Sequence, residues 1–224
     1  MRRYFQTYLL TAGFALLTSA VSAQHTYQLR STIQGLNQAK IFLRKQDNNN
    51  ARVLTVDTTR AQNGTFSFRR AIPEIDFYTV SVEGVPGQTS FIWDHDVVLT
   101  GDTKDLRTAE VAGSPLTDEW KKFQTEVDLP YRDQLMTLYN ARQQSPANTA
   151  VAERVANEEK RLKQEQMQKV QQYIRTNRTS LLSLFLLNSH WTAFSKADAK
   201  ALYDQLDPTF RTHSVAKRLE RQLW

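Results

Sequence analysis

The run Asp94-His95-Asp96 has the residue types most suited to chemistry in this sequence, and it lies between two apolar stretches. Carboxylate oxygens and imidazole nitrogens are common ligands of divalent cations, and a loop can present them together. Successive residues of an extended segment point to opposite sides, however, so three neighbours seldom converge on one ion. A polar turn between two strands is the alternative interpretation, and the sequence favours it.

Exposed tryptophans are a second kind of candidate, because an indole ring can stack on a sugar or a peptide. Trp93 directly precedes the acidic run, and Trp224 is the last residue of the sequence. Most tryptophans instead pack in cores. The candidate surface for a ligand or a protein partner therefore consists of Trp93, Asp94, His95, Asp96 and Trp224.

The rest of the sequence contains no recognisable catalytic pattern. The four histidines lack the HExxH spacing of zinc proteases, and the sequence has neither a G-x-S-x-G nucleophile motif nor a glycine-rich phosphate loop. There is no cysteine, which excludes thiol catalysis, disulfides and Cys-ligated metals. We therefore predict a protein that is not an enzyme, with no catalytic residues, no bound metal and no cofactor.

The first residues have the pattern of a secretory signal peptide. Arg2 and Arg3 precede a mostly apolar stretch from Tyr8 to Val21, and the small residues of Val21-Ser22-Ala23 predict cleavage after Ala23. An uncleaved N-terminal anchor is the alternative, although the stretch is short for a span of about 20 residues. We expect an exported protein in the periplasm or outer cell envelope, with no membrane span after cleavage.

Charge argues against nucleic acid as a partner. Residues 24–112 hold ten basic and ten acidic residues, and residues 113–224 hold seventeen and thirteen. This excess is small, and both signs alternate along the C-terminal part, which is typical of a solvated helix surface. Another envelope protein is the expected partner, and the sequence leaves the oligomeric state open.

Residues 24–112 have the period of two that is typical of strands. The strand-like segments are short, and turn signals separate them at 8–12-residue intervals, which predicts an antiparallel β-sandwich or partial barrel. They are TYQLRSTI, AKIFLRK, ARVLTVDTT, TFSF, DFYTVSV, GQTSFIWD and DVVLTGD. Asn63-Gly64 before Thr-Phe-Ser-Phe predicts a tight hairpin turn, with Phe66 and Phe68 in the core.

Residues 113–224 have the helical period, so the chain is predicted to be α+β with a second, helical domain. Ser114 and Pro115 are suited to the N-cap and first turn of a helix, and Pro130 is expected to end or kink it. A long amphipathic helix follows from Thr149 to Ile174. SLLSLFLL at 180–187 is too short to cross a bilayer and is predicted to form a buried helix. Ser195 is predicted to cap a further helix, and Asp207-Pro208 is predicted to open the last one.

The order of these features resembles the bacterial domain-of-unknown-function family 4369. The resemblance rests on YQLRSTIQGL, DTT at 57–59, NGTFSF, FIWDHDVVLTGD and VAGSPLTDEW, followed by the helical segments LLSLFLLNSH, KADAKALYDQLDP and HSVAKRLERQL. Such modules precede ResA/TlpA-like thioredoxin domains in exported bacterial proteins. The resemblance implies an accessory module, but the Cys-x-x-Cys pair of the longer relatives is absent here, so their redox activity is not carried over.

Three functions remain open from the sequence. The first is a non-enzymatic envelope module that binds another protein through an edge strand or the exposed helix near residues 150–175. The second is a partner of a separately encoded thioredoxin-like thiol-disulfide oxidoreductase. The third is a protein that binds a carbohydrate or another small ligand near Asp94–Asp96.

Overall fold

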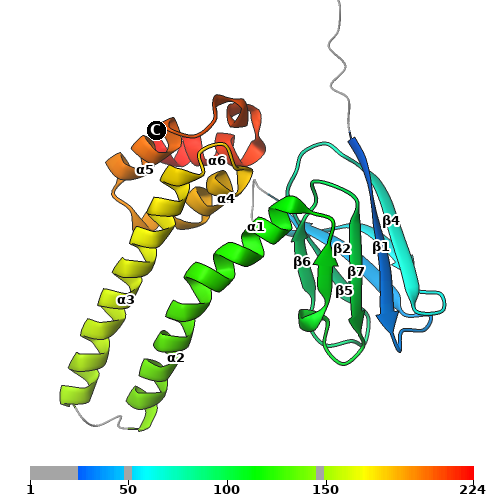
Figure 1. Cartoon of the computed structure of the whole chain (residues 1–224), viewed down its shortest axis with the longest axis horizontal. Helices are drawn as coiled ribbons and strands as arrows, with labels where there is room; N and C mark the ends of the chain where they lie inside the picture. Colours follow the sequence, from blue (N-terminus) through cyan, green and yellow to red (C-terminus); the bar gives the residue numbers. More distant parts are fainter. Residues whose placement is uncertain (1–24, 48–51, 145–148) are drawn as a thin grey trace, which may run out of the picture.

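The computed structural model describes residues 25–47, 52–144 and 149–224, and the predicted signal peptide of residues 1–23 lies outside them. Strands come first and helices follow (Figure 1), so the chain is α+β as predicted. The strands are β1 (His25–Gln34), β2 (Lys40–Gln46), β3 (Val53–Arg60), β4 (Thr65–Ile72), β5 (Phe77–Val82), β6 (Thr89–Ile92), β7 (Val97–Asp102) and β8 (Glu110–Ala112).

The strands form two four-stranded sheets, in the orders β4-β1-β7-β8 and β3-β2-β5-β6. Inward side chains of both sheets share one core, which includes Leu29, Leu43, Phe66 and Leu99, so the arrangement is a β-sandwich. One pairing departs from the predicted antiparallel pattern, because β1 and β7 are parallel. A parallel pair needs a long connection between its strands, and local periodicity carries no sign of that.

The Asn63-Gly64 turn is confirmed, and it does more than join two paired strands. Gln62 and Thr65 exchange both backbone hydrogen bonds, at 2.9 and 3.0 Å, and Asn63 and Gly64 have φ angles of 50° and 78°. Both angles lie in the left-handed region that Asn and Gly tolerate best. Because β3 and β4 belong to different sheets, the turn is the corner at which the chain crosses the sandwich.

A continuous helical path follows the sandwich. It consists of α1 (Pro115–Phe123), a π-helical segment η2 (Gln124–Asp128) and α2 (Leu129–Gln144). Ser114 caps α1 as predicted, since its hydroxyl accepts a hydrogen bond from the Thr117 amide at 2.9 Å. Pro130 does not end the helix. It lacks an N–H group, and the wider π-helical turn lies directly before it, as is common where the regular bonding pattern is interrupted.

The remaining helices are α3 (Thr149–Thr176), α4 (Leu181–His190), α5 (Lys196–Asp204) and α6 (Ser214–Leu223), with short 3₁₀ segments at Leu106–Thr108, Trp191–Ala193 and Pro208–Thr212. The long helix, the buried helix α4 and the cap at Ser195 are confirmed. Asp207-Pro208 opens a 3₁₀ turn rather than the last helix, which begins after His213. No helix among the described residues is long and apolar enough to cross a membrane.

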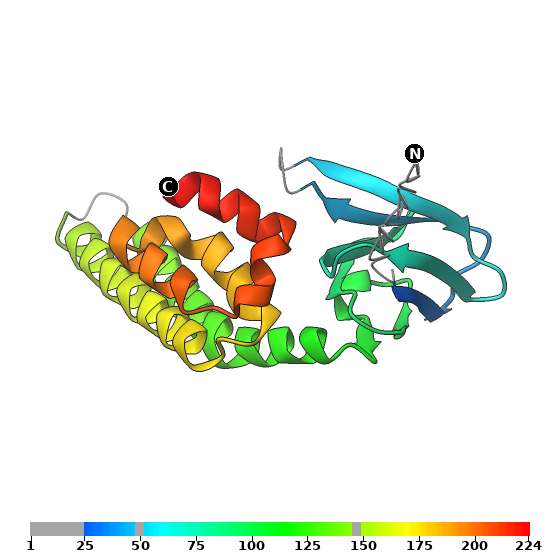
Figure 2. The same ribbon diagram turned by 90° about the horizontal axis from the view of Figure 1, so that it is seen from above.

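A second core lies among the helices, and it also receives side chains from the sandwich. Ile92 of β6 is buried in it, and Ile75 and Phe77 pack against it. Figure 2 shows α1 joining the two regions along one side, while the start of α6 approaches the sandwich from the other. The two regions therefore meet through apolar packing as well as through the connecting helix.

Candidate functional site

Trp93 lies in the sandwich core and is not part of an exposed surface. The side chain is 0% exposed, and its ring is in edge contact with Tyr78 and Phe91, with centroids 5.1 and 5.8 Å away. The expectation that Trp93 could offer a stacking platform is therefore wrong. It occupies an inward position just after β6, where its large apolar area stabilises the fold instead.

Asp94 is also buried, and it holds the sandwich to the first helix. Its carboxylate is 4% exposed, and Oδ2 accepts a hydrogen bond from the Leu116 amide at 3.1 Å. A negative charge is favourable at this end of a helix because unpaired amides and the helix dipole point toward it. Thr117 adds a second link, since its hydroxyl accepts a hydrogen bond from the Ile92 amide at 2.9 Å.

His95 and Asp96 contact different residues and do not face a common site. His95 is 62% exposed, with Nδ1 3.3 Å from Asp94 Oδ2, and its ring stacks on Tyr27 at 6.0 Å between centroids. Asp96 accepts a hydrogen bond from the Gln28 amide at 2.8 Å, across to β1. Within the described ranges, no three His, Asp or Glu side chains are grouped to hold a metal ion. The hydrogen bonds of Asp94 and Asp96 give this loop a structural role.

Trp224 lies on the helical region, apart from the Trp93–Asp96 loop. It is 62% exposed, its ring contacts Tyr203 with centroids 5.6 Å apart, and Lys200 Nζ lies 4.8 Å from its centroid. The five residues of the predicted surface therefore do not form one site. The sequence alone could not show this separation, because residues far apart in a sequence can lie either together or apart in the fold. Trp224 follows α6 in the helical region, and the loop follows β6 in the sandwich.

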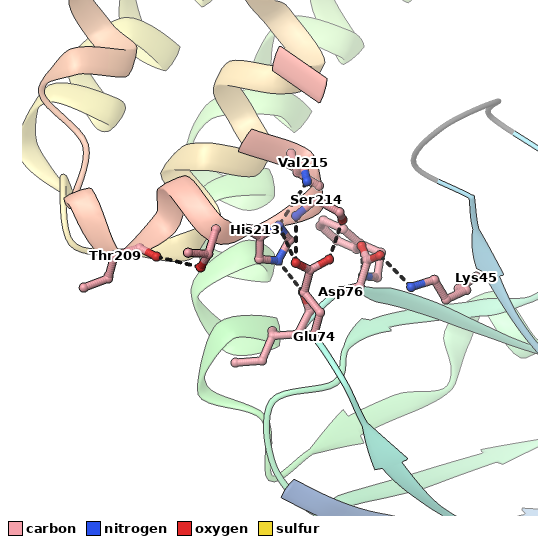
Figure 3. Close-up of polar contacts among 10 residues, drawn as sticks. Lys45, Glu74, Asp76, Thr209, His213, Ser214 and Val215 are labelled. Atoms are coloured by element: carbon pink, nitrogen blue, oxygen red, sulfur yellow. Dashed lines mark hydrogen bonds and ion pairs between the residues drawn. The ribbon is translucent and has the colours of Figure 1, made fainter. Parts of the chain in front are cut away.

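A polar cluster joins the loop between β4 and β5 to the start of α6 (Figure 3). Glu74 accepts hydrogen bonds from the Ser214 amide, at 2.7 Å, and from the Ser214 hydroxyl. His213 Nε2 lies 2.9 Å from the Ile75 carbonyl oxygen, and Nδ1 accepts from the Val215 amide at 3.2 Å. Nε2 therefore carries the hydrogen and donates a hydrogen bond to the carbonyl oxygen of Ile75. These bonds fix α6 on the sandwich.

Beside this cluster, Lys45 of β2 forms an ion pair with Asp76, with Nζ and Oδ2 3.1 Å apart. Burial opposes the positive charge of Lys45, but the charge of Asp76 and its hydrogen bond outweigh that effect and raise the pKa of Lys45. Asp76 is buried, and its backbone carbonyl accepts a hydrogen bond from the Trp93 amide at 3.1 Å. The pair therefore supports the loop that presents Glu74.

Replacing Glu74 by alanine is expected to lower the free energy of unfolding by about 1–2 kcal/mol, because the first amide of α6 loses its acceptor. Thermal or urea unfolding measures this loss. Glu83→Ala is the matched control, since Glu83 is exposed at the end of β5, and it should change stability by about 0.5 kcal/mol or less. Equal losses of stability in the two variants would show that Glu74 does not stabilise the contact between the β4–β5 loop and α6.

His190, the last residue of α4, gives the fold a pH dependence. Burial lowers its pKa, and the negative charge of Asp128 opposes that shift only in part. In the unfolded chain the imidazole takes up a proton at about pH 6.5, but in the folded protein it does so only at a lower pH. Its contribution to stability is therefore complete above about pH 6.5 and is lost as the pH falls below that value.

The measurement is urea unfolding of the wild type and of His190→Gln at about pH 7.5 and about pH 5.5. We expect the wild type to lose more stability between these pH values than the variant, in which position 190 does not titrate. An equal loss in both proteins would contradict the assignment.

A predominantly apolar groove lies between α2 and α3. Its volume is about 650 Å³. Figure 1 shows the lower parts of both helices running side by side, away from α4–α6. We call it the α2–α3 groove, and its lining residues are Asp128, Arg132, Leu135, Met136, Leu138, Tyr139 and Arg142 on one side and Val155, Glu159 and Gln166 on the other.

Helix α2 packs chiefly against α3. None of its sixteen residues is buried, which is unusual for a helix that packs against another one. Met136 and Tyr139 are 56% and 57% exposed. Exposed apolar groups that are contiguous and rimmed by polar residues commonly mark interaction surfaces. Leu135, Leu138 and Tyr139 form an apolar stripe in the sequence, and the apolar pattern alone does not show that no other described residue covers it.

Comparison with known proteins gives one match to a family. Residues 27–120 match the family described as domain of unknown function (DUF4369). The matched range covers the sandwich and ends within α1, so it includes the contacts of Asp94 and Ser114 that attach this helix. No curated protein and no solved structure gives a significant match to the chain. Residues 27–120 are therefore similar to the DUF4369 family, and the helices from α2 onward lie outside the matched range.

Proposed function

We propose that the protein is an exported, non-enzymatic accessory module of the cell envelope that binds another protein through the α2–α3 groove. The observation that carries this proposal is α2 itself, a sixteen-residue helix with no buried residue and with Met136 and Tyr139 exposed over an apolar groove. A flexible methionine and an amphipathic tyrosine are typical of protein-binding surfaces. The other long helices bury an apolar face in the second core.

Export is supported by the first residues of the sequence, with Arg2 and Arg3, the apolar stretch and the small residues ending at Ala23. The intact mass of the protein isolated from its native cells tests this part. A chain that begins at Gln24 in the envelope fraction is the expected result. A chain that retains residues 1–23 in the cytoplasmic fraction would contradict it.

The binding surface can be tested by site-specific photocrosslinking in living cells. The photoreactive residue p-benzoylphenylalanine replaces Met136 in the groove, Leu54 on edge strand β3, or Val98 on β7, all of which are exposed apolar positions. We expect a discrete crosslinked adduct from position 136 and none from position 98. Adducts from position 54 alone would move the binding surface to the edge strand, where β-strand addition is the known mode.

The resemblance to modules that accompany thioredoxin-like domains favours one alternative, in which the bound protein is a separately encoded thiol-disulfide oxidoreductase. This role needs no cysteine in the present chain. Identification of the adduct from position 136 by mass spectrometry separates the two versions, because only the second predicts a protein with a Cys-x-x-Cys pair.

A further inference from the structure

We propose that the occupant of the α2–α3 groove is an acidic amphipathic helix of another protein. This inference rests on the proposed function and adds the chemistry of the partner. Helices commonly bind in apolar grooves between two other helices, where an apolar stripe on the ligand meets the groove floor and charges at the rim set the choice of partner.

The spacing of residues along α2 gives the groove its shape. Arg132, Leu135, Tyr139 and Arg142 follow one another at intervals of three and four residues and so lie on one face of the helix. The apolar pair lies in the middle and one arginine lies toward each end. Ten residues of helix separate the two arginines, which corresponds to about 15 Å along the axis.

The charges of the groove are not equally available to a ligand. The carboxylate of Glu159 is bound by Lys163 Nζ at 2.5 Å, and that of Asp128 accepts a hydrogen bond from Gln166 at 3.1 Å. Arg132 has only a loose contact, at 3.7 Å between its Nε and the exposed carboxylate of the neighbouring Asp133. Lys163 thus compensates the charge of Glu159, and Asp128 accepts a hydrogen bond from an uncharged amide, while the arginines keep most of their donors for a ligand.

Arg142 acts on Glu159 through its charge, which adds to the hydrogen bond from Lys163 in holding the pKa of Glu159 low. It forms no direct ion pair among the described residues, so its guanidinium group is also available. The free donors of Arg132 and Arg142, one toward each end of the apolar pair, therefore favour an acidic ligand over a basic one.

A second copy of this chain fits the groove less well. A two-fold antiparallel pairing of α2 with its own copy, centred between Leu135 and Tyr139, would place Arg132 of one chain opposite Arg142 of the other. Like charges in direct opposition are unfavourable at an interface. An acidic helix whose carboxylates are about ten residues apart instead meets both arginines at once.

The test is a selection from a displayed library of helical peptides. Each peptide carries a fixed leucine stripe, and the flanking positions vary among Glu, Gln and Lys. The chain from Gln24 onward is the bait, and Leu135→Ser/Tyr139→Ser is the counter-selection. Because neither residue is buried, this variant should keep the fold. We expect the retained peptides to be enriched in Glu at positions about ten residues apart.

Binding of a retained peptide is then measured by fluorescence anisotropy. The double reversal Arg132→Glu/Arg142→Glu should weaken it about tenfold or more, and added salt should weaken wild-type binding. Arg154→Glu, an exposed reversal on α3 outside the groove lining, should change it by no more than about twofold. Basic or neutral peptides, equal binding to the double reversal, or no retained peptide would each overturn the proposal.

Sedimentation of the wild type tests whether a second copy of this chain occupies the groove. A wild-type dimer that the substitutions Leu135→Ser/Tyr139→Ser dissociate would also overturn the proposal. Failure here and failure of the proposed function are separable. A native adduct from position 136 without peptide enrichment leaves an interaction module whose ligand is not an acidic helix. Acidic peptides without any native adduct would leave the groove chemistry intact and remove the accessory role.

Discussion

Replacing Trp93 by alanine should lower the free energy of unfolding by about 3–5 kcal/mol, the largest effect we expect from any single substitution in the β-sandwich. The indole is fully buried and lies against Tyr78 and Phe91. Removing it loses the transfer free energy of a large ring and leaves a cavity that neighbouring side chains fill only in part. Urea unfolding followed by far-UV circular dichroism measures the loss.

Trp224→Ala is the matched control, because it removes the same side chain from an exposed position. Contacts with Tyr203 and Lys200 hold that ring, so the expected loss is about 1 kcal/mol or less. If Trp93→Ala lowered the free energy of unfolding no more than Trp224→Ala, Trp93 would not be a buried core residue. The loop at Asp94–Asp96 would then again be a candidate ligand site.

Replacing Phe77 by alanine is expected to cost about 2–4 kcal/mol, mainly at the contact between the two regions. Phe77 lies on β5 but faces the helices, and its ring lies 5.0 Å from Trp120 of α1 and 5.1 Å from Phe185 of α4, centroid to centroid. The side chain is only partly buried, so the loss should be smaller than for Trp93. Its removal should loosen the helical region from the sandwich.

Phe42→Ala is the control for this substitution. Phe42 is a partly buried phenylalanine on the same sheet, where Lys40 and Arg44 flank its ring. Hydrogen exchange by mass spectrometry should show faster exchange in α6 and in the loop at Glu74 for Phe77→Ala, and unchanged exchange there for Phe42→Ala. Unchanged exchange in both variants would mean that Phe77 does not couple the regions.

Local chemistry made several features predictable from sequence. Asn-Gly at 63–64 tolerates positive φ angles, and Ser114-Pro115 combines a cap with a residue already shaped for the first helical turn, so both features depend on near neighbours alone. The same is true of the period of the long helix α3. These elements appear where the sequence placed them.

Features that depend on distant residues were not predictable. The parallel pairing of β1 with β7 needs two segments far apart in the sequence. Pro130 was expected to end or kink a helix; the helix does not end there, because a π-helical segment directly before it keeps the path continuous, and this local rearrangement leaves no mark in the apolar pattern. Trp93 and Asp94 looked accessible because they adjoin a polar run, and the fold instead uses both for its own attachment to α1 and the core.

The groove shows the same limit for function. An apolar stripe on α2 is visible in the sequence, but the pattern cannot distinguish a face that packs from a face left open. Arg132 and Arg142 became informative only when the structure placed them along one groove with Leu135 and Tyr139 between them.

The most direct test of the accessory role is affinity co-purification from the native cell envelope, with the chain from Gln24 onward as bait and quantitative mass spectrometry as readout. Wild type, Leu135→Ser/Tyr139→Ser and Trp224→Ala are compared as baits. We predict a partner that the wild type and Trp224→Ala recover and the groove variant loses. Equal recovery by the groove variant, or no partner above background with the wild type, would contradict binding through the α2–α3 groove.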